Sequence, residues 1–242
     1  MRSTCRAFTL MQVLSAIAAL STLALEPVVV LAAARTVSFR SPSGRTVEAS
    51  LNESSQRPAT AVVLVGMLGH SRDDWQAIAQ RMADAHITTL AIDLPGAVAP
   101  GDPGALANWS DDIRGAVAYL ASRPETRAGA IGVVGAALGA SLAGIAAAGD
   151  SQIRSLVLVS PTSDYRGVRL DNALRQYGAR PAYLVASQQD PYAARSAREL
   201  AKNPPGIRQV QMAEAAASGT SLLIREPDLV RLVIEWFQRT LG

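Results

Sequence analysis

The sequence predicts an α/β fold, with a mostly parallel central sheet of about eight strands, helices on both faces and an antiparallel start. The chain has 242 residues, of which 49% are apolar and 18% charged, so it can bury one large core. Short continuous apolar runs alternate with segments of helical spacing, which is typical of buried parallel strands joined by helices. Between the first two runs, Ser41-Pro42-Ser43-Gly44 predicts a hairpin.

Each element is predicted from its local pattern. Strands are expected over residues 36–39, 45–51, 61–65, 88–92, 130–134, 155–159, 182–186 and 207–212. Helices are expected over residues 73–85, 110–120, 137–148, 191–201 and 228–241, with Ser110 as an N-cap. The Gly- and Pro-rich stretch Ala97–Ala107 is predicted to be a loop. No internal repeat or linker divides residues 35–242, so they are expected to form a single domain.

Charge and scarce residue types exclude several classes of function. The net charge is +3 and no basic block occurs, which argues against nucleic-acid binding. The sequence has one cysteine, Cys5, and two histidines, His70 and His86. A disulfide framework and a thiolate metal site are therefore not expected, and no metal or other cofactor is predicted.

Residues 1–34 have the pattern of a signal peptide. Arg2 and Arg6 precede a mostly apolar stretch that ends in Ala32-Ala33-Ala34, a small-residue cleavage site. The alternative is an uncleaved membrane anchor, since about 20 apolar residues can span a bilayer. Polar residues dilute the stretch and favour cleavage before Arg35. Either reading predicts an exported protein, periplasmic or secreted in the first case and membrane-anchored in the second.

A strand-to-helix junction carries the most informative motif. Gly135-Ala136-Ala137-Leu138-Gly139 follows an apolar strand and opens a helix, and it resembles the Gly-x-Ser-x-Gly nucleophile elbow of α/β-hydrolases. Glycines flank this turn because side chains at those positions would collide. The central residue is Ala137, whose methyl group cannot attack a carbonyl carbon. A tightly packed seam of small residues between helix and sheet is the alternative interpretation of this stretch alone.

Further segments share the resemblance, from about residue 36 to 241. Ser71-Arg72-Asp73-Asp74-Trp75 resembles the helix that follows the oxyanion loop, and Asp93-Leu94-Pro95-Gly96 resembles the loop after the next strand. Gln188-Gln189-Asp190-Pro191 resembles the loop of the catalytic acid, and Ser218-Gly219-Thr220 resembles the His-Gly-Thr of the catalytic base. The similarity is to small dienelactone-hydrolase-like and esterase-like members, which have no large lid. It implies the α/β-hydrolase fold.

The same resemblance implies that most of the catalytic side chains are lost. Ala137 stands at the nucleophile position, Asp190 at the acid position and Ser218 at the base position. Gly66 and Ala97 stand where the family usually has two further histidines. The backbone N–H groups of Met67 and Leu138 would form the oxyanion hole. This combination predicts a catalytically degenerate hydrolase.

Other residues could replace the lost side chains only with difficulty. Ser141 lies one helical turn beyond Ala137, away from the tip of the elbow. His70 follows the oxyanion-type loop and is expected at the mouth of a pocket, whereas His86 is expected at the far side of the sheet. Without a histidine to orient, Asp190 is expected to cap the helix that begins at Pro191.

Three hypotheses of function remain open. The first is an exported pseudo-hydrolase that keeps a pocket for a small apolar or carbonyl-containing ligand, or for a partner. The second is an active carboxylic-ester hydrolase with a non-standard site, built around His70 and Asp190. The third is a structural or interaction domain whose pocket has no role.

The N-terminal pattern gives a first testable prediction. The exported protein should begin near Arg35, which intact-mass spectrometry of the secreted or periplasmic fraction would measure. An unprocessed chain retained in the membrane fraction would contradict cleavage and support the anchor.

Overall fold

The computed structural model describes residues 34–96, 100–202 and 205–242. The predicted signal segment, except for Ala34, therefore lies outside the described residues, as does Ala97. Eight strands form one sheet in the order β1-β2-β4-β3-β5-β6-β9-β10. Their bounds are β1 Arg35–Arg40, β2 Thr46–Asn52, β3 Ala59–Val65, β4 Ile87–Ile92, β5 Thr126–Ala136, β6 Ile153–Val159, β9 Ala182–Ser187 and β10 Arg208–Ala213.

The pairing of the strands confirms the predicted sheet. Strand β1 pairs antiparallel with β2, and β2 antiparallel with β4. The pairs β3–β4, β3–β5, β5–β6, β6–β9 and β9–β10 are all parallel. Strands β3, β4, β6 and β9 are buried almost throughout, because both of their faces are covered.

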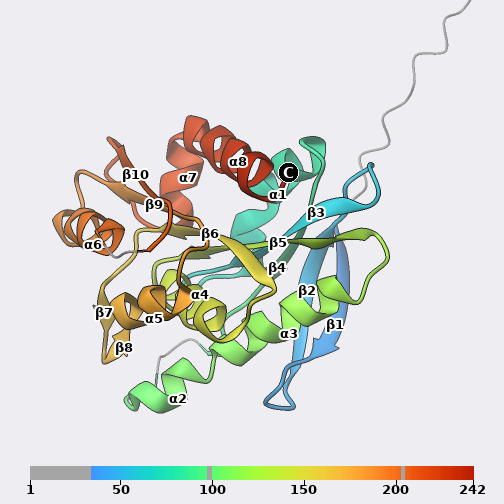
Figure 1. Cartoon of the computed structure of the whole chain (residues 1–242), viewed down its shortest axis with the longest axis horizontal. Helices are drawn as coiled ribbons and strands as arrows, with labels where there is room; N and C mark the ends of the chain where they lie inside the picture. Colours follow the sequence, from blue (N-terminus) through green and yellow to red (C-terminus); the bar gives the residue numbers. More distant parts are fainter. Residues whose placement is uncertain (1–33, 97–99, 203–204) are drawn as a thin grey trace, which may run out of the picture. The chain divides into compact units, whose positions relative to one another are not determined.

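Helices cover both faces of the sheet, as predicted (Figure 1). One face is covered by the short 3₁₀ helix η1 (Arg72–Trp75) with α1 (Gln76–Asp84), α7 (Thr220–Arg225) and α8 (Pro227–Leu241). The other is covered by α3 (Ser110–Ala121), α4 (Leu138–Gly149), α5 (Leu170–Tyr177) and α6 (Pro191–Ala201).

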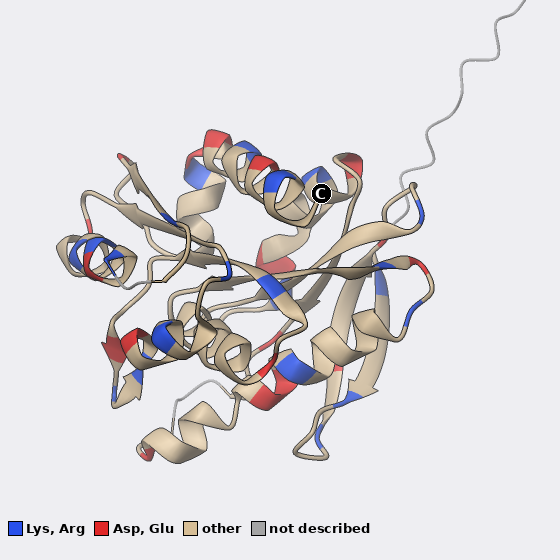
Figure 2. Cartoon of the chain, in the orientation of Figure 1, with Lys and Arg blue, Asp and Glu red and all other residues tan. Residues whose placement is uncertain are grey.

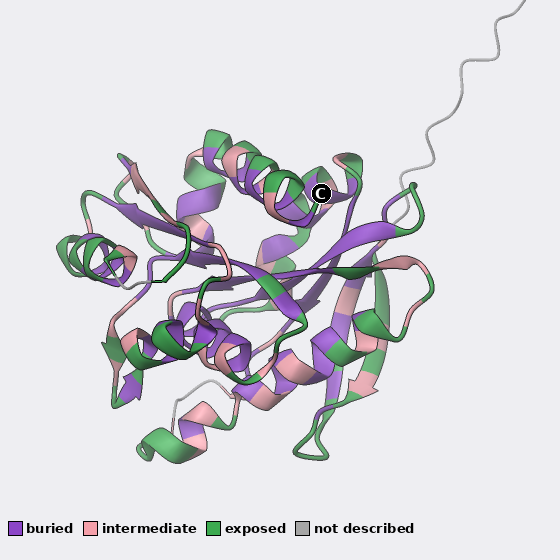
Figure 3. Cartoon of the chain, viewed as in Figure 1, coloured by how far each residue is buried: buried purple, intermediate pink, exposed green. Residues whose placement is uncertain are grey.

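Two apolar clusters fill the layers between sheet and helices. Alternate residues of β3 enter different clusters, with Val63 on the side of α4 and Val62 on the side of α8. Figure 3 shows the central strands as the most continuously buried part of the described chain. The indole of Trp236 is fully buried on α8, and its N–H donates to the Ser155 hydroxyl at 2.8 Å. This hydrogen bond fixes α8 to β6 without leaving a buried donor unpaired.

The structure corrects two predictions of local structure. Residues Pro103–Ala107, expected to belong to a loop, form the short helix α2, because the Asp102 carboxylate accepts hydrogen bonds from the first-turn N–H groups and Pro103 follows it. Ser110 is the first residue of α3 and not its N-cap, since the helix is preceded by Trp109 in a helical conformation.

The sequence analysis also missed short elements between β6 and β9. A two-stranded hairpin of β7 (Asp164–Tyr165) and β8 (Val168–Arg169) leads into α5, whose apolar side packs on α4.

The outer surface carries charges of both signs. Figure 2 shows basic and acidic residues interspersed along α3 and α8, while the central strands carry few charges. Across residues 34–96, 100–202 and 205–242, the structure contains no helix that is long and apolar enough to cross a membrane.

Candidate functional site

Ala137 lies in a strained turn at the carboxyl end of β5. Its backbone has φ 51° and ψ −116°, a conformation that non-glycine residues rarely adopt and that costs about 1–3 kcal/mol. Its N–H donates to the Val159 carbonyl at 2.9 Å, and α4 begins at the next residue. The turn therefore has the sharp geometry of a nucleophile elbow and presents a methyl group there.

The two glycines of the motif are required by close backbone contacts. A Cβ atom on Gly135 would lie 2.3 Å from the Gly139 carbonyl oxygen, and one on Gly139 would lie 2.4 Å from the Gly66 oxygen. Both distances are far below any real Cβ contact, and the obstacles are backbone atoms. The glycines thus let β5, α4 and the loop after β3 approach one another, which brings the elbow and the oxyanion-type loop together.

Two backbone N–H groups near this junction have no protein partner among the described residues. Leu138 is the first residue of α4, so its N–H has no acceptor within the helix. Met67 follows β3, and its carbonyl accepts from the His70 N–H at 3.2 Å. Within the described residues, no hydrogen bond from either the Leu138 or the Met67 N–H is present. Such donors, together with the positive end of α4, suit an oxygen atom that carries negative charge.

Gly66 leaves a buried donor beside the oxyanion-type loop unpaired. The Trp75 side chain is fully buried, and its indole N–H has no hydrogen-bond partner among the described residues. A Cβ atom on Gly66 would lie 3.7 Å from that nitrogen, which is an ordinary contact. A side chain at position 66 would therefore fit next to the indole.

Asp190, predicted from the resemblance to stand at the acid position, caps a helix. It follows β9, and its Oδ1 accepts a hydrogen bond from the Ala193 N–H at 3.0 Å, while Pro191 opens α6. This is the geometry of a favoured N-cap. One carboxylate oxygen serves the cap, and the other is not used by it.

The segment at the base position is fixed by its backbone. Ser218 is exposed, while Gly219 is buried and has a positive φ of 56°. The Gly219 N–H donates to the Ser160 hydroxyl at 2.9 Å. A Cβ atom on Gly219 would lie 2.0 Å from the Met67 sulfur, so the Met67 thioether packs directly on this glycine. The structure thus brings the base loop against the oxyanion-type loop.

Neither histidine side chain forms a hydrogen bond with Asp190 or Ser218 among the described residues. His70 Nδ1 is 2.8 Å from Asp74 Oδ2, and both side chains are partly exposed. His70 lines a shallow cavity of about 380 Å³ together with Arg45 and Leu94, and no hydrogen bond joins it to Asp190. His86 is exposed and directly precedes β4, so it lies at the opposite edge of the sheet from Ala137.

Ser141 is enclosed within α4. Its side chain is fully buried, and its Oγ is 3.4 Å from the Thr162 Oγ1. A hydroxyl in this position packs between α4 and the segment after β6. A substrate carbonyl group therefore cannot reach it, and Ser141 is not a nucleophile.

Two residues that organise the site were missed by the sequence analysis. Ser160, at φ 50°, directly follows β6, and its hydroxyl accepts a hydrogen bond from the Gly219 N–H. Its signal was its place directly after a buried strand, at the edge where Ala137 and Asp190 also lie. Arg72 holds Asp93, which accepts from the Arg72 backbone N–H at 2.6 Å and also pairs with its guanidinium. Asp93 thereby ties the loop after β4 to η1.

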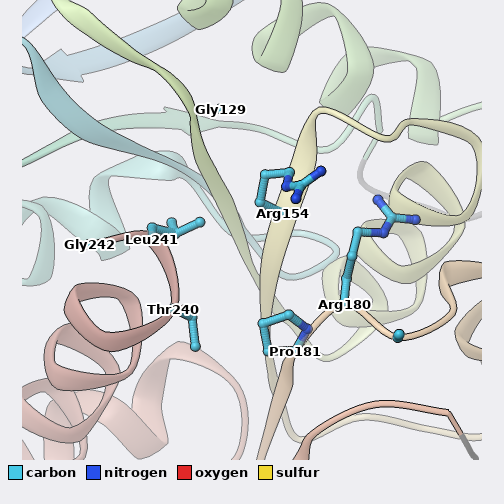
Figure 4. A pocket seen from close by; sticks show the side chains of 8 residues that line it. Gly129, Arg154, Arg180, Pro181, Thr240, Leu241 and Gly242 are labelled. Carbon is cyan, nitrogen blue, oxygen red and sulfur yellow. The ribbon is translucent and has the colours of Figure 1, made fainter.

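A cavity at the opposite edge of the sheet has a structural explanation. It measures about 440 Å³, and Figure 4 shows the side chains of Arg154 and Arg180 beside it. The Arg180 guanidinium donates to the carbonyl oxygens of Ala147, Asp150 and Ile153 at 2.7–2.8 Å, which caps the end of α4. Burial lowers the pKa of Arg180. The guanidinium is thus largely used by the fold itself.

Comparisons with known proteins agree on one family. The model described as "Alpha/beta hydrolase family" matches residues 61–238. A dienelactone hydrolase from Anabaena variabilis is similar in structure, with a TM-score of 0.70 and 21% identity, over 87% of this chain and all of that chain. No curated protein matches the sequence.

Two esterase structures are similar at lower identity. An esterase domain from Rhodothermus marinus gives a TM-score of 0.70 and 16% identity, over 86% of this chain and all of that one. A thermostable carboxylesterase cloned from a metagenomic library gives 0.69 and 16%, over 88% of this chain and 90% of that one. Likeness at such identities concerns the fold, and it confirms the predicted fold class.

The close contacts at the elbow give a prediction about stability. Gly135→Ala should lower the free energy of unfolding by about 3 kcal/mol or more, because its methyl group would meet backbone atoms that cannot move aside. Urea denaturation followed by circular dichroism measures this change. Gly144→Ala, within α4, is the matched control: there the methyl group meets only the end of the Leu170 side chain, and alanine favours the helix. Equal losses in the two variants would contradict this account of the turn.

Proposed function

The chain belongs to the alpha/beta hydrolase family, and we propose that it is a member that binds a carbonyl or carboxylate compound without cleaving it. The observation that carries the proposal is Ala137, which holds the strained elbow conformation with a methyl group at the nucleophile position. A methyl group has neither a lone pair nor a proton to transfer, so no acyl-enzyme can form on it.

The base position supports the same proposal. Ser218 cannot act as a general base near neutral pH, since its hydroxyl has no basic lone pair comparable to that of imidazole. The only two histidines of the chain are His70, paired with Asp74, and His86, at the opposite edge. Of the three family roles, only the acid side chain, Asp190, is present.

Backbone groups are the basis for binding. The N–H groups of Met67 and Leu138 belong to the main chain, so loss of catalytic side chains leaves them in place. A carbonyl oxygen or a carboxylate could accept hydrogen bonds from both, and the N-terminus of α4 favours negative charge there. The ligand would therefore be a small compound whose carbonyl or carboxylate group lies against the methyl group of Ala137.

An active hydrolase with a non-standard site is the second candidate. The observation in its favour is the His70–Asp74 pair at 2.8 Å, which is the arrangement of a base and its orienting carboxylate. Ser71 is the adjacent hydroxyl, and its Oγ accepts from the Asp73 N–H as the cap of η1. Among the described residues no hydrogen bond joins the Ser71 hydroxyl to His70, so this candidate lacks the contact between nucleophile and base, and binding without cleavage is the better-supported function.

We also propose that the protein acts outside the cytoplasm. The support is the pattern of residues 1–34, a positive start followed by an apolar stretch and a small-residue cleavage site. A protein that only binds its ligand would then act as an extracytoplasmic carrier or sensor of small carbonyl compounds.

The absence of a nucleophile can be tested directly. The protein should hydrolyse short activated esters no faster than the buffer blank, and a fluorophosphonate probe should label no serine, because Ala137 offers no reactive hydroxyl. Intact-mass spectrometry after probe treatment measures the labelling, with an active serine esterase in the same tube as the control. Stoichiometric labelling of a serine would establish the second candidate instead.

Repair of the triad tests the assignment of its positions. Ala137→Ser alone should restore little activity, and Ser218→His alone none, because each lacks its partner. The double variant should exceed the sum of the two by at least tenfold in kcat/KM on an activated ester, because triad members act as a unit. The unused oxygen of Asp190 is available to orient the new imidazole.

The control for the repair is a third change. Adding Asp190→Asn to the double variant should remove most of the gain, because the imidazole loses its orienting carboxylate. A folded double variant no more active than Ala137→Ser would show that Ser218 is not at the base position.

A further inference from the structure

Strand β10 forms an open edge of the central sheet (Figure 1). Among the described residues it pairs with β9 alone, and the carbonyl oxygens of Ile207 and Ala213 accept hydrogen bonds from that side. Because the direction of the backbone groups alternates along a strand, Val210 and Met212 point their N–H and C=O groups outward. The Met212 carbonyl accepts from the Gln211 carboxamide at 2.9 Å, and a second lone pair remains on that oxygen.

The residues of this edge do not prevent a further strand from pairing with it. Edge strands usually avoid such pairing by means of charges, prolines or bulges. The stretch Gln209–Met212 contains no charged residue and no proline, and its pairing with β9 has no bulge. Val210 and Met212 are partly exposed, and Ile207, directly before the strand, is 66% exposed. The edge therefore presents both unpaired backbone groups and apolar side chains.

The charges at the two ends of β10 favour a second copy of the same strand. Arg208 begins the strand, and Glu214 follows it directly. Neither forms an ion pair within the described part of the chain, and the Arg208 guanidinium donates to the carbonyl oxygens of Gly178 and Arg180. In an antiparallel pair of two β10 strands, Arg208 of each copy can stand opposite Glu214 of the other. Opposite charges on directly facing residues stabilise a strand pair.

The same register also pairs the outward backbone groups. Val210 of each copy stands opposite Met212 of the other, so their N–H and C=O groups form hydrogen bonds between the two strands. Gln211 faces Gln211 on the two-fold axis, as a symmetric interface requires. The side chains of Val210 and Met212 already pack at the border of the apolar cluster on the α4 side of the sheet, and the second copy would cover them.

The other edge of the sheet lacks this complementarity. Strand β1 begins with Arg35 and ends with Arg40, so an antiparallel pair of two β1 strands would place arginine opposite arginine at both ends. Arg35 also lies 3.6 Å from Glu53 Oε2 of its own chain. Of the two edge strands, β10 is therefore the one that suits a second copy.

We propose that two copies of the protein associate through β10, joining their sheets antiparallel with Arg208 of each copy opposite Glu214 of the other. The next residue, Ala215, is already held in its own chain, because its carbonyl accepts from the Ser187 hydroxyl at 2.6 Å. Association would thus fix both ends of the segment that leads to Ser218. The interface does not use the elbow, so a monomeric protein would contradict this proposal and leave the proposed function untouched.

The mass of the protein in solution tests the association, and sedimentation equilibrium measures it. The purified protein should have the mass of two chains, and Glu214→Lys should weaken the association about tenfold or more, because a like charge then faces Arg208 at both ends of the pair. Glu48→Lys, at an exposed position of β2, makes the same change of charge far from β10 and should leave the association unchanged. A protein that stays monomeric at its highest soluble concentration would overturn the proposal, and so would a dimer that Glu214→Lys does not weaken.

Disulfide crosslinking tests the register of the two strands. Gln211→Cys should give a covalent dimer under mild oxidation, because the two copies of this residue face each other as a non-hydrogen-bonded pair with closely spaced Cα atoms. Gln209→Cys, on the same face of β10, is the matched control and should not crosslink, because residue 209 of each copy stands opposite Ala213 of the other. Both variants retain Cys5, so any linkage through that residue would be common to both. Crosslinking of the Gln209 variant and not of the Gln211 variant would show a different register and overturn the pairing of Arg208 with Glu214.

Discussion

The arrangement of the candidate site depends on one constraint, the close backbone approach around Ala137. The Gly139 oxygen lies where a Gly135 side chain would be, and the Gly66 oxygen lies where a Gly139 side chain would be. Close packing therefore joins strand β5 to helix α4 and to the loop after β3. It is possible only because Gly135 and Gly139 have no side chains. The positive φ of Ala137 follows from this packing, because the chain must reverse within very few residues.

Most of the fold was predictable from the sequence because its signals are local. The buried strands are continuous apolar runs, such as Ala61–Val65, and the helices between them carry apolar residues at helical spacing. Helix α2 was missed because glycine and proline dominate its surroundings, although Asp102-Pro103 is itself a helix start. The β7–β8 hairpin is too short to leave a periodic pattern.

The site was predictable only in part. The roles of Ala137, Asp190 and Ser218 were predicted from the resemblance to α/β-hydrolases, and the three residues follow β5, β9 and β10, whose carboxyl ends lie at one edge of the sheet. The contacts that hold this edge together could not be predicted from the sequence. The Ser160–Gly219 hydrogen bond joins residues 59 positions apart, and the Met67 thioether packs on the same Gly219. Neither contact has a sequence pattern, because each depends on how two loops cross after the sheet has formed.

Asp190 has a structural role that is independent of any chemistry. Its carboxylate accepts the Ala193 N–H and starts α6, so an aspartate here stabilises the fold whether or not a histidine needs orienting. Positions 137 and 218 carry no side chain with a comparable structural role. Ala137 has only a methyl group in the turn, and the Ser218 side chain is exposed. The aspartate at position 190 therefore does not by itself indicate an active site. A serine at position 137 or a histidine at position 218 would have no such structural explanation, and would be the more informative residue.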